Sequence, residues 1–214
     1  MNVIAIGAHP DDIEFNCAGT LVKHIERGDE VVMISVSDGA TVNHKNETIR
    51  SKENATIEAK SAAELIGAEL YILGYKALDI PHNHRIVSEL ESIINRHKAD
   101  IVYTHWHGHT NQDHWRVSLS VLAAARCVDR VLMWEEGIPH SSCTSGFNPQ
   151  VYIDITGQQD KKMQAIALHR SQMEKYRTDL LEGIIARARY RGYQIRKKYA
   201  ECFELNRMVD DFLI

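Results

Sequence analysis

The sequence predicts an α/β fold built on a doubly wound, mainly parallel sheet with helices on both faces. Short apolar runs rich in β-branched residues alternate with longer stretches whose apolar residues recur every three or four positions. The first pattern is typical of buried strands and the second of amphipathic helices. Their alternation along the chain indicates strands joined by helical crossovers, which is a Rossmann-like arrangement.

The expected elements follow from these runs in chain order. Buried strands are expected at residues 3–6, 30–36, 69–73, 100–104, 130–134 and 151–155, and a last strand or extended tail at 200–205. Helices are expected at residues 14–27, 50–66, 85–96, 113–122, 161–176 and 180–198. Gly28 and Gly67 stand where the first two helices should stop. The polar segment 41–48 and the Pro- and Ser-containing segment 135–149 are expected to be loops.

Composition narrows the class of protein. The chain has 214 residues without a repeat, linker or low-complexity segment, so we expect residues 1–214 to form one domain. A net charge of -4 argues against a nucleic-acid binder. The four cysteines are scattered, which fits reduced thiols in the cytoplasm better than a disulfide framework. There is no signal-peptide pattern and no apolar run long enough for membrane insertion, so we expect a cytoplasmic location.

The first expected strand ends in a turn rich in ionisable side chains. Gly7 ends the strand, and His9-Pro10-Asp11-Asp12 follows at once. Pro10 fixes its own φ and lacks an amide donor, so the chain must turn there before the next helix. Ligands of open α/β sheets bind outside the carboxyl ends of the strands. This turn is therefore a candidate active site.

A second group of such side chains follows the strand at 100–104. It comprises His105, His107, His109, Asp113 and His114. A hydrolytic zinc site needs three His or carboxylate ligands, an open position for water and a free carboxylate nearby. Asp11 and Asp12 can divide the roles of ligand and base, because successive residues of a turn point in different directions. The residues alone do not select among the later histidines.

Five segments in the same order resemble one known family. Ala8-His9-Pro10-Asp11-Asp12 followed by Glu14 resembles the signature of the LmbE-like / PIG-L zinc-dependent N-deacetylases. The other similar segments are Arg50-Ser51-Lys52-Glu53, Asn111-Gln112-Asp113-His114, Tyr152-Ile153-Asp154-Ile155 with Lys161-Lys162 and His169-Arg170-Ser171-Gln172, and Arg191-Gly192 with Tyr199-Ala200-Glu201-Cys202-Phe203. The resemblance thus extends along most of the chain.

The resemblance implies a role for each matching residue. The zinc ligands would be His9, Asp12 and His114, and the general base would be Asp11. One Zn²⁺ per chain is expected, with other divalent ions as alternatives. The implied substrate is a small N-acetylated sugar or conjugate, and relatives suggest a homo-oligomer.

Two departures from the family pattern bear on the substrate side of the site. Many members carry His at the position of Asn111, and an amide cannot transfer a proton. Protonation of the leaving amine would then fall to Asp11 or His109, so Asn111 and His109 are substrate-side candidates. The family often has an Asp soon after a Leu-Gly turn, but the nearest here, Asp79, comes later than expected.

Two further residues are candidates for contact with the substrate. Arg50 matches a family Arg that faces the substrate, although it could instead form a helix-start ion pair with Glu53. Asp38 follows the strand at 30–36 and should lie near His9 if the two strands are parallel neighbours. Asp38 could equally bind backbone amides of its own turn.

The remaining charged residues allow two interpretations each. Glu14 could orient His9 as a carboxylate behind a metal-bound histidine, or could act as a first-turn acid of the helix. Glu135 and Glu136 could line the cleft, but a solvated acidic loop is the expected reading. The basic residues of 187–198 could be a solvated helix face or an oligomer contact.

The function expected from the sequence is removal of an N-acetyl group from a GlcNAc-type sugar or its conjugate, by metal-activated water with an Asp base. One alternative is an amidase of the same fold acting on a larger acyl group or a thiol conjugate. Another alternative is a non-catalytic sugar-nucleotide binding module. It is the weaker one, because the chain has no GxGxxG motif.

Overall fold

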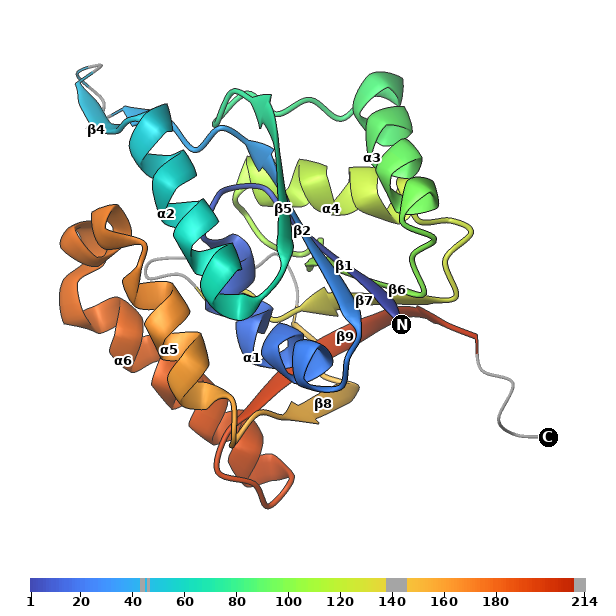
Figure 1. The fold of residues 1–214 in the computed structure, drawn as a ribbon, viewed down its shortest axis with the longest axis vertical. Coiled ribbons are helices and arrows are strands. Elements are labelled where there is room, and N and C mark those ends of the chain that lie inside the picture. Colours follow the sequence, from blue (N-terminus) through green and yellow to red (C-terminus); the bar gives the residue numbers. More distant parts are fainter. Residues whose placement is uncertain (43–44, 46, 138–145, 210–214) are drawn as a thin grey trace.

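One seven-stranded sheet organises the protein, in the strand order β5-β2-β1-β6-β7-β9-β8 (Figure 1). The structure is a computed structural model that describes residues 1–42, 45, 47–137 and 146–209. The strands of the sheet are β1 (Asn2–Gly7), β2 (Glu30–Ser37), β5 (Glu69–Tyr75), β6 (Ile101–His105), β7 (Arg130–Trp134), β8 (Val151–Asp154) and β9 (Ala200–Met208). β5, β2, β1, β6 and β7 pair in parallel, and β9 runs antiparallel to both β7 and β8.

Helices cover both faces of this sheet, as the sequence predicts (Figure 1). They are α1 (Asp12–Glu26), α2 (Lys52–Ile66), α3 (His84–Arg96), α4 (Gln112–Ala124), α5 (Gln159–Ala167) and α6 (Arg170–Gln194). Val3 and Ala5 of β1 point into a core shared with α1, α2 and α5. Ile4 and Ile6 point to the opposite face, into a core shared with α3 and α4. Alternate residues of one strand thus serve two cores, which confirms the doubly wound α/β fold.

The order of the strands places a switch point beside β1. From β1 the chain moves outward through β2 to β5, then returns to the other side of β1 to form β6 and β7. The connections that leave the carboxyl ends of β1 and β6 therefore diverge. In open α/β sheets this is where a ligand-binding crevice forms.

Local signals set where several helices begin and end. The Asn83 side chain accepts hydrogen bonds from the amides of Arg85 and Ile86 at the start of α3, and Ser51 accepts from Asn54 at the start of α2. Gly67 ends α2 in the left-handed conformation, with φ 95°, as its position in the sequence predicts.

The largest differences from the sequence prediction lie in three places. The polar segment expected to be a loop contains a two-stranded ribbon, β3 (Thr41–Val42) and β4 (Thr48–Arg50). Arg50, expected as the first residue of a helix, is instead the last residue of β4. Ser51 caps α2, which follows. The helix expected at 161–176 is interrupted at Leu168 and His169, and α6 then continues past a kink at Arg177 (φ 54°, ψ -143°).

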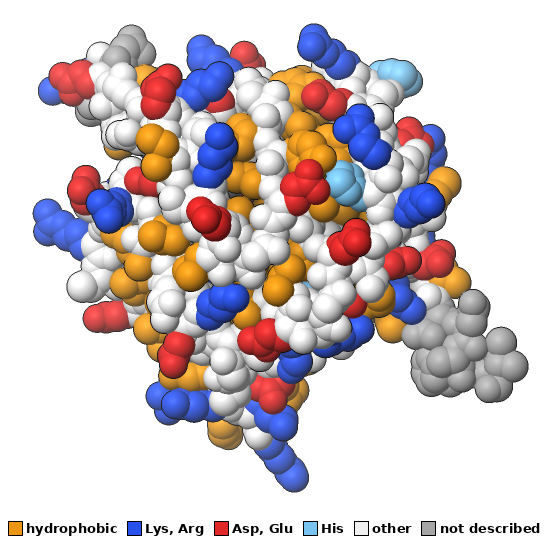
Figure 2. Space-filling view, viewed as in Figure 1, with side chains coloured by type: hydrophobic (Ala, Val, Ile, Leu, Met, Phe, Trp, Pro, Cys, Tyr) orange, Lys and Arg blue, Asp and Glu red, His pale blue; other side chains and the backbone are white. Residues whose placement is uncertain are grey.

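The surface and the cysteines agree with the composition. Basic and acidic side chains are interspersed on the face shown in Figure 2. Across the part of the chain that the structure describes, no helix combines the length and apolar character needed to cross a bilayer. Cys17, Cys127 and Cys202 are free thiols. Cys143, and the middle of the loop expected at 135–149, lie outside the described residues.

Candidate active site

The turn after β1 is tight enough to bring three ionisable side chains together. The amides of Asp11 and Asp12 both donate to the His9 carbonyl oxygen, at 3.0 and 3.3 Å. The His9 amide in turn donates to Asp12 Oδ2 at 2.7 Å. Gly7 permits this fold-back, because a Cβ atom there would lie 3.0 Å from Asp12 Cβ. Asp12 therefore begins α1 with its carboxylate directed back across the end of β1.

The start of α4 supplies a further side chain, His114, from the other side of the switch point. Asn111 Oδ1 accepts hydrogen bonds from the amides of Asp113 and His114, at 2.9 and 3.5 Å. Such a cap fixes the first turn of a helix. His114 is therefore held rigidly over the carboxyl end of the sheet, although it lies about a hundred residues from His9 in the chain.

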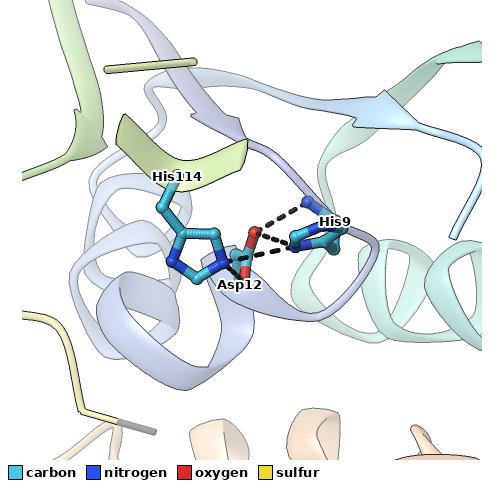
Figure 3. A group of neighbouring side chains, drawn as sticks. All are labelled: His9, Asp12 and His114. Atoms are coloured by element: carbon cyan, nitrogen blue, oxygen red, sulfur yellow. Dashed lines mark hydrogen bonds and ion pairs between the residues drawn. The ribbon is translucent and has the colours of Figure 1, made fainter. Parts of the chain in front are cut away.

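His9, Asp12 and His114 form a compact triangle (Figure 3). His9 Nδ1 lies 3.2 Å from His114 Nε2 and 3.4 Å from Asp12 Oδ2. His114 Nε2 lies 3.3 Å from Asp12 Oδ1. For tetrahedral zinc with bonds of about 2.0–2.1 Å, two ligand atoms are about 3.3 Å apart. The three side chains thus place possible ligand atoms at about the spacing of zinc ligands, with Asp12 facing His9 through Oδ2 and His114 through Oδ1.

A buried carboxylate supports the first of these histidines from behind. His9 Nε2 lies 2.9 Å from Asp113 Oδ2, which also accepts from the Leu78 amide at 2.6 Å. Although burial alone would raise it, the pKa of Asp113 is lowered, chiefly by the hydrogen bond with His9. A proton on Nε2 leaves the Nδ1 lone pair directed into the triangle. Metal-bound histidines commonly have such a partner.

Asp11 lies beside the triangle and is held by Arg50. Arg50 Nη1 donates to Asp11 Oδ2 at 2.8 Å, and its Nη2 donates to the Pro10 carbonyl at 3.0 Å and to Glu58 Oε2 at 2.8 Å. Burial raises the pKa of Asp11, and the Arg50 charge opposes that rise. One carboxylate oxygen of Asp11 is thus committed to Arg50, while the other is available to the pocket.

These groups line one pocket of about 140 Å³. Its floor includes the His9, Asp12, His114 triangle, and Asp11, Arg50 and Asn111 also line it. Its apolar wall includes Phe15, Leu78 and Tyr176. The arrangement combines three side chains that could hold a divalent metal, a neighbouring carboxylate and an apolar wall, which together suit hydrolysis of a small amide.

Comparison with known proteins identifies the family. The family model PIG-L, described as GlcNAc-PI de-N-acetylase, matches residues 4–125, which is more than half of the chain. This chain belongs to the PIG-L family. The match covers the turn after β1 and the start of α4, so the resemblance seen in the sequence is confirmed.

Individual proteins are similar to this chain over nearly its whole length. The diacetylchitobiose deacetylase of Thermococcus kodakarensis is 25% identical over 222 residues, covering 93% of this chain and 80% of that protein. The structure of the Pyrococcus horikoshii N,N'-diacetylchitobiose deacetylase covers 100% of this chain and 88% of its own, with a TM-score of 0.78 and 22% identity. GalB, the 4-carboxy-2-hydroxymuconate hydratase of Pseudomonas putida KT2440, has a TM-score of 0.83 and 19% identity, with 98% of each chain covered. The fold is therefore shared by enzymes named for different reactions.

In this PIG-L family member, the structure brings the predicted metal ligands and Asp11 together. Of the predicted substrate residues, Arg50 and Asn111 line the pocket, whereas His109 and Asp38 are not among the described lining residues. Asn111 lines the pocket while capping α4. The His109 ring is stacked on the His114 ring, with centroids 5.0 Å apart, and its Nδ1 accepts from the Asn111 amide at 3.1 Å. Burial lowers the pKa of His109. His109 therefore packs behind the site, outside the described residues that line the pocket.

Two loop carboxylates fall outside that lining as well. Asp38 Oδ1 accepts from the Ala40 amide at 3.1 Å, which is the local turn interaction named as the alternative. Asp79 is exposed, in the turn where its amide donates to the Lys76 carbonyl. The described lining residues include neither of them.

The predicted interactions of Arg50 and Glu14 are corrected. Arg50 pairs with Asp11 and Glu58, so the helix-start pair with Glu53 is wrong. The Glu14 carboxylate lies 3.0 Å from His169 Nε2, and the interpretation that it orients His9 is also wrong. His169, whose Nδ1 lies 3.3 Å from Arg50 Nη2, was missed as a site residue. In the sequence, only the HxSQ-like segment points to His169. In the structure, His169 immediately precedes α6.

The acidic pair after β7 is not a solvated loop. Glu135 accepts hydrogen bonds from Arg191, and its carbonyl accepts from Arg187 Nη1 at 2.8 Å. The Glu136 side chain is 1% exposed and contacts His105. Both carboxylates are therefore structural partners of other side chains. Arg187 and Arg191 are therefore not part of a fully solvated helix face. The oligomer contact stays a prediction.

Proposed function

We propose that this protein is a zinc-dependent N-deacetylase that removes the acetyl group from an N-acetylated sugar of the GlcNAc type or its conjugate. The single observation that carries the proposal is the His9, Asp12, His114 triangle beside the Asp11 carboxylate. The names of the Thermococcus and Pyrococcus relatives support the same bond type and a sugar substrate.

The chemistry can be divided between the metal and the chain. Bound zinc would polarise the amide carbonyl and lower the pKa of a water molecule. Asp11 would accept the proton of that water as it attacks the acetyl carbon, because its Oδ1 is not held by Arg50. Arg50 keeps the Asp11 carboxylate oriented and favours its charged form.

The later steps also have candidate groups. Because Asn111 Oδ1 faces the amides of α4, its Nδ2 is the atom available to donate to the developing oxyanion. Asp11 would return its proton to the amine nitrogen as the C–N bond breaks, giving acetate and a free amine. His109 is less suited to that proton transfer, since it packs behind His114.

Other features of the proposal rest on the sequence. A cytoplasmic location, a homo-oligomeric state and a single domain over residues 1–214 remain predictions. Zinc is proposed over other divalent ions because two imidazole nitrogens and one carboxylate oxygen form a ligand set typical of catalytic zinc.

The test is an acetate-release screen over N-acetyl sugars and their conjugates, with longer N-acyl analogues as the comparison. We expect acetate release to require metal, to stop with a chelator and to return on addition of Zn²⁺. Cleavage of only the longer acyl groups would favour the amidase alternative. Purified protein that binds no divalent metal would refute the proposal.

A further inference from the structure

A second set of buried titratable groups lies directly behind the metal triangle. His105 is the last residue of β6, and Glu136 lies two residues beyond the end of β7. Their side chains are 0% and 1% exposed. Neither belongs to the set of ligands proposed above, and neither lines the described pocket. Their burial beside Asp12 and His114 calls for a physical explanation.

His105 and Glu136 close a ring of contacts with Asp12 and His114. His105 Nε2 lies 3.1 Å from Asp12 Oδ2, and His105 Nδ1 contacts Glu136 Oε1 directly. Glu136 Oε2 lies 3.5 Å from His114 Nδ1, and His114 Nε2 lies 3.3 Å from Asp12 Oδ1. The His105 and His114 rings are also stacked, with centroids 4.2 Å apart and planes at 27°.

This arrangement suits a support better than a second metal site. His105, His114 and Glu136 do carry nitrogen and oxygen atoms close enough to hold an ion. However, His105 Nδ1 and Glu136 Oε1 are in direct hydrogen-bonding contact, closer than the ~3.3 Å between two ligand atoms of one tetrahedral zinc. Trp134 Nε1 also donates to Glu136 Oε1, at 3.1 Å. That oxygen is therefore already bound by two donors.

The ring accounts for the orientation of two ligands at once. Glu136 Oε2 is the carboxylate oxygen that faces the outer nitrogen of His114, at 3.5 Å, and neither atom has a hydrogen-bond partner among the described residues. A small closing of this gap, with the proton on Nδ1, would pair both atoms and leave the Nε2 lone pair for the metal. The same carboxylate holds the His105 ring through Nδ1, while His105 Nε2 accepts from the Ala8 amide at 2.9 Å and lies 3.1 Å from Asp12 Oδ2. Asp113 does the equivalent for His9. Each histidine of the triangle thus has a buried carboxylate on its far side.

We propose that Glu136 is a positioning residue of the metal centre, facing His114 directly and holding the His105 ring against Asp12. This inference rests on the proposed function, in that His9, Asp12 and His114 are taken to bind the metal. It adds a residue outside the five segments that carried the family resemblance.

The test compares Glu136→Gln with the neighbouring Glu135→Gln in the full chain. Zinc affinity is measured by competition with a chromophoric chelator, and Co²⁺ is substituted so that its visible absorption reports ligand geometry. We expect Glu136→Gln to bind zinc about 10–100-fold more weakly and to alter the Co²⁺ spectrum. Glu135→Gln should match wild type in both, because Glu135 pairs with Arg191 instead.

A second variant separates position from charge. Glu136→Asp keeps the negative charge but is one methylene shorter, so it cannot reach both histidines. A positioning role predicts weaker zinc binding and a changed Co²⁺ spectrum in this variant too. Wild-type zinc affinity in either Glu136 variant, with only a lower melting temperature of the metal-free protein, would overturn the inference. Failure of the wild type to bind metal would instead refute the proposed function.

Discussion

Replacing Asp11 by asparagine should abolish most turnover while leaving the metal site intact. The substitution is nearly isosteric. With its Oδ1 toward Arg50, the new amide can keep the hydrogen bond that Asp11 Oδ2 now accepts at 2.8 Å. Its Nδ2 would then replace the oxygen that faces the pocket. An amide nitrogen cannot accept a proton, so the base is lost without a change of shape.

The expected size of the loss follows from the role assigned to this carboxylate. Positioned general bases contribute about 10²–10⁴-fold to rate, which corresponds to about 2.7–5.5 kcal/mol of activation free energy. The effect on folding should be small by comparison. Loss of the ion pair with Arg50 destabilises the fold, but removal of the buried Asp11 charge offsets part of this loss. We expect a net decrease of about 1 kcal/mol in the free energy of unfolding.

The assay measures acetate release and bound zinc on the same preparation. Asp160→Asn, at an exposed carboxylate in the first turn of α5, is the matched control and should behave as wild type. If Asp11→Asn holds zinc and hydrolyses substrate at the wild-type rate, Asp11 is not the base. Loss of zinc in this variant would show instead that Asp11 takes part in metal binding.

Three further predictions test the metal site and the fold. His114→Ala should remove zinc from the purified protein, and full zinc occupancy by elemental analysis would refute its role as a ligand. The buried Glu201 carboxylate lies 2.6 Å from Lys162 Nζ, and Lys162→Met removes this counter-charge. Urea denaturation should therefore show a decrease of about 3–5 kcal/mol in the free energy of unfolding. A decrease below about 1 kcal/mol would contradict this. Although burial opposes it, Arg191 lowers the pKa of Glu135 below its usual value of about 4.3. This carboxylate therefore stabilises the fold above that pH and loses the effect as the pH falls through its lower folded-state pKa. Glu135→Gln should lose less melting temperature than wild type on acidification, and parallel curves would count against the ion pair.

The parts of the fold that depend on local pattern could be predicted from the sequence. β1 and β2 are continuous apolar runs because both of their faces are covered, and their parallel pairing follows from the helices between strands. The turn at His9 was predictable because Pro10 and Gly7 constrain the backbone. His114 was found through the family resemblance, since several nearby histidines look equivalent in the sequence.

What the sequence could not predict are the partners that meet only in the folded chain. Glu136 looks like a surface residue because nothing local shows that His105 lies opposite it. Arg50 pairs with Glu58 of α2, and His169, at the break between α5 and α6, packs against Phe15 and lies beside Glu14. Long-range pairing of buried charges carries no short-range signature.

The pocket is assembled from two sources that differ in how tightly the structure constrains them. The proposed ligands come from the turn after β1 and from the first turn of α4, where backbone and cap hydrogen bonds fix the chain. The opposite wall comes from the segment of α6 before its kink at Arg177, which supplies Gln172, Lys175 and Tyr176. Substitutions on this one turn of α6 can therefore reshape a wall of the pocket while the turn after β1 and the start of α4 keep their geometry.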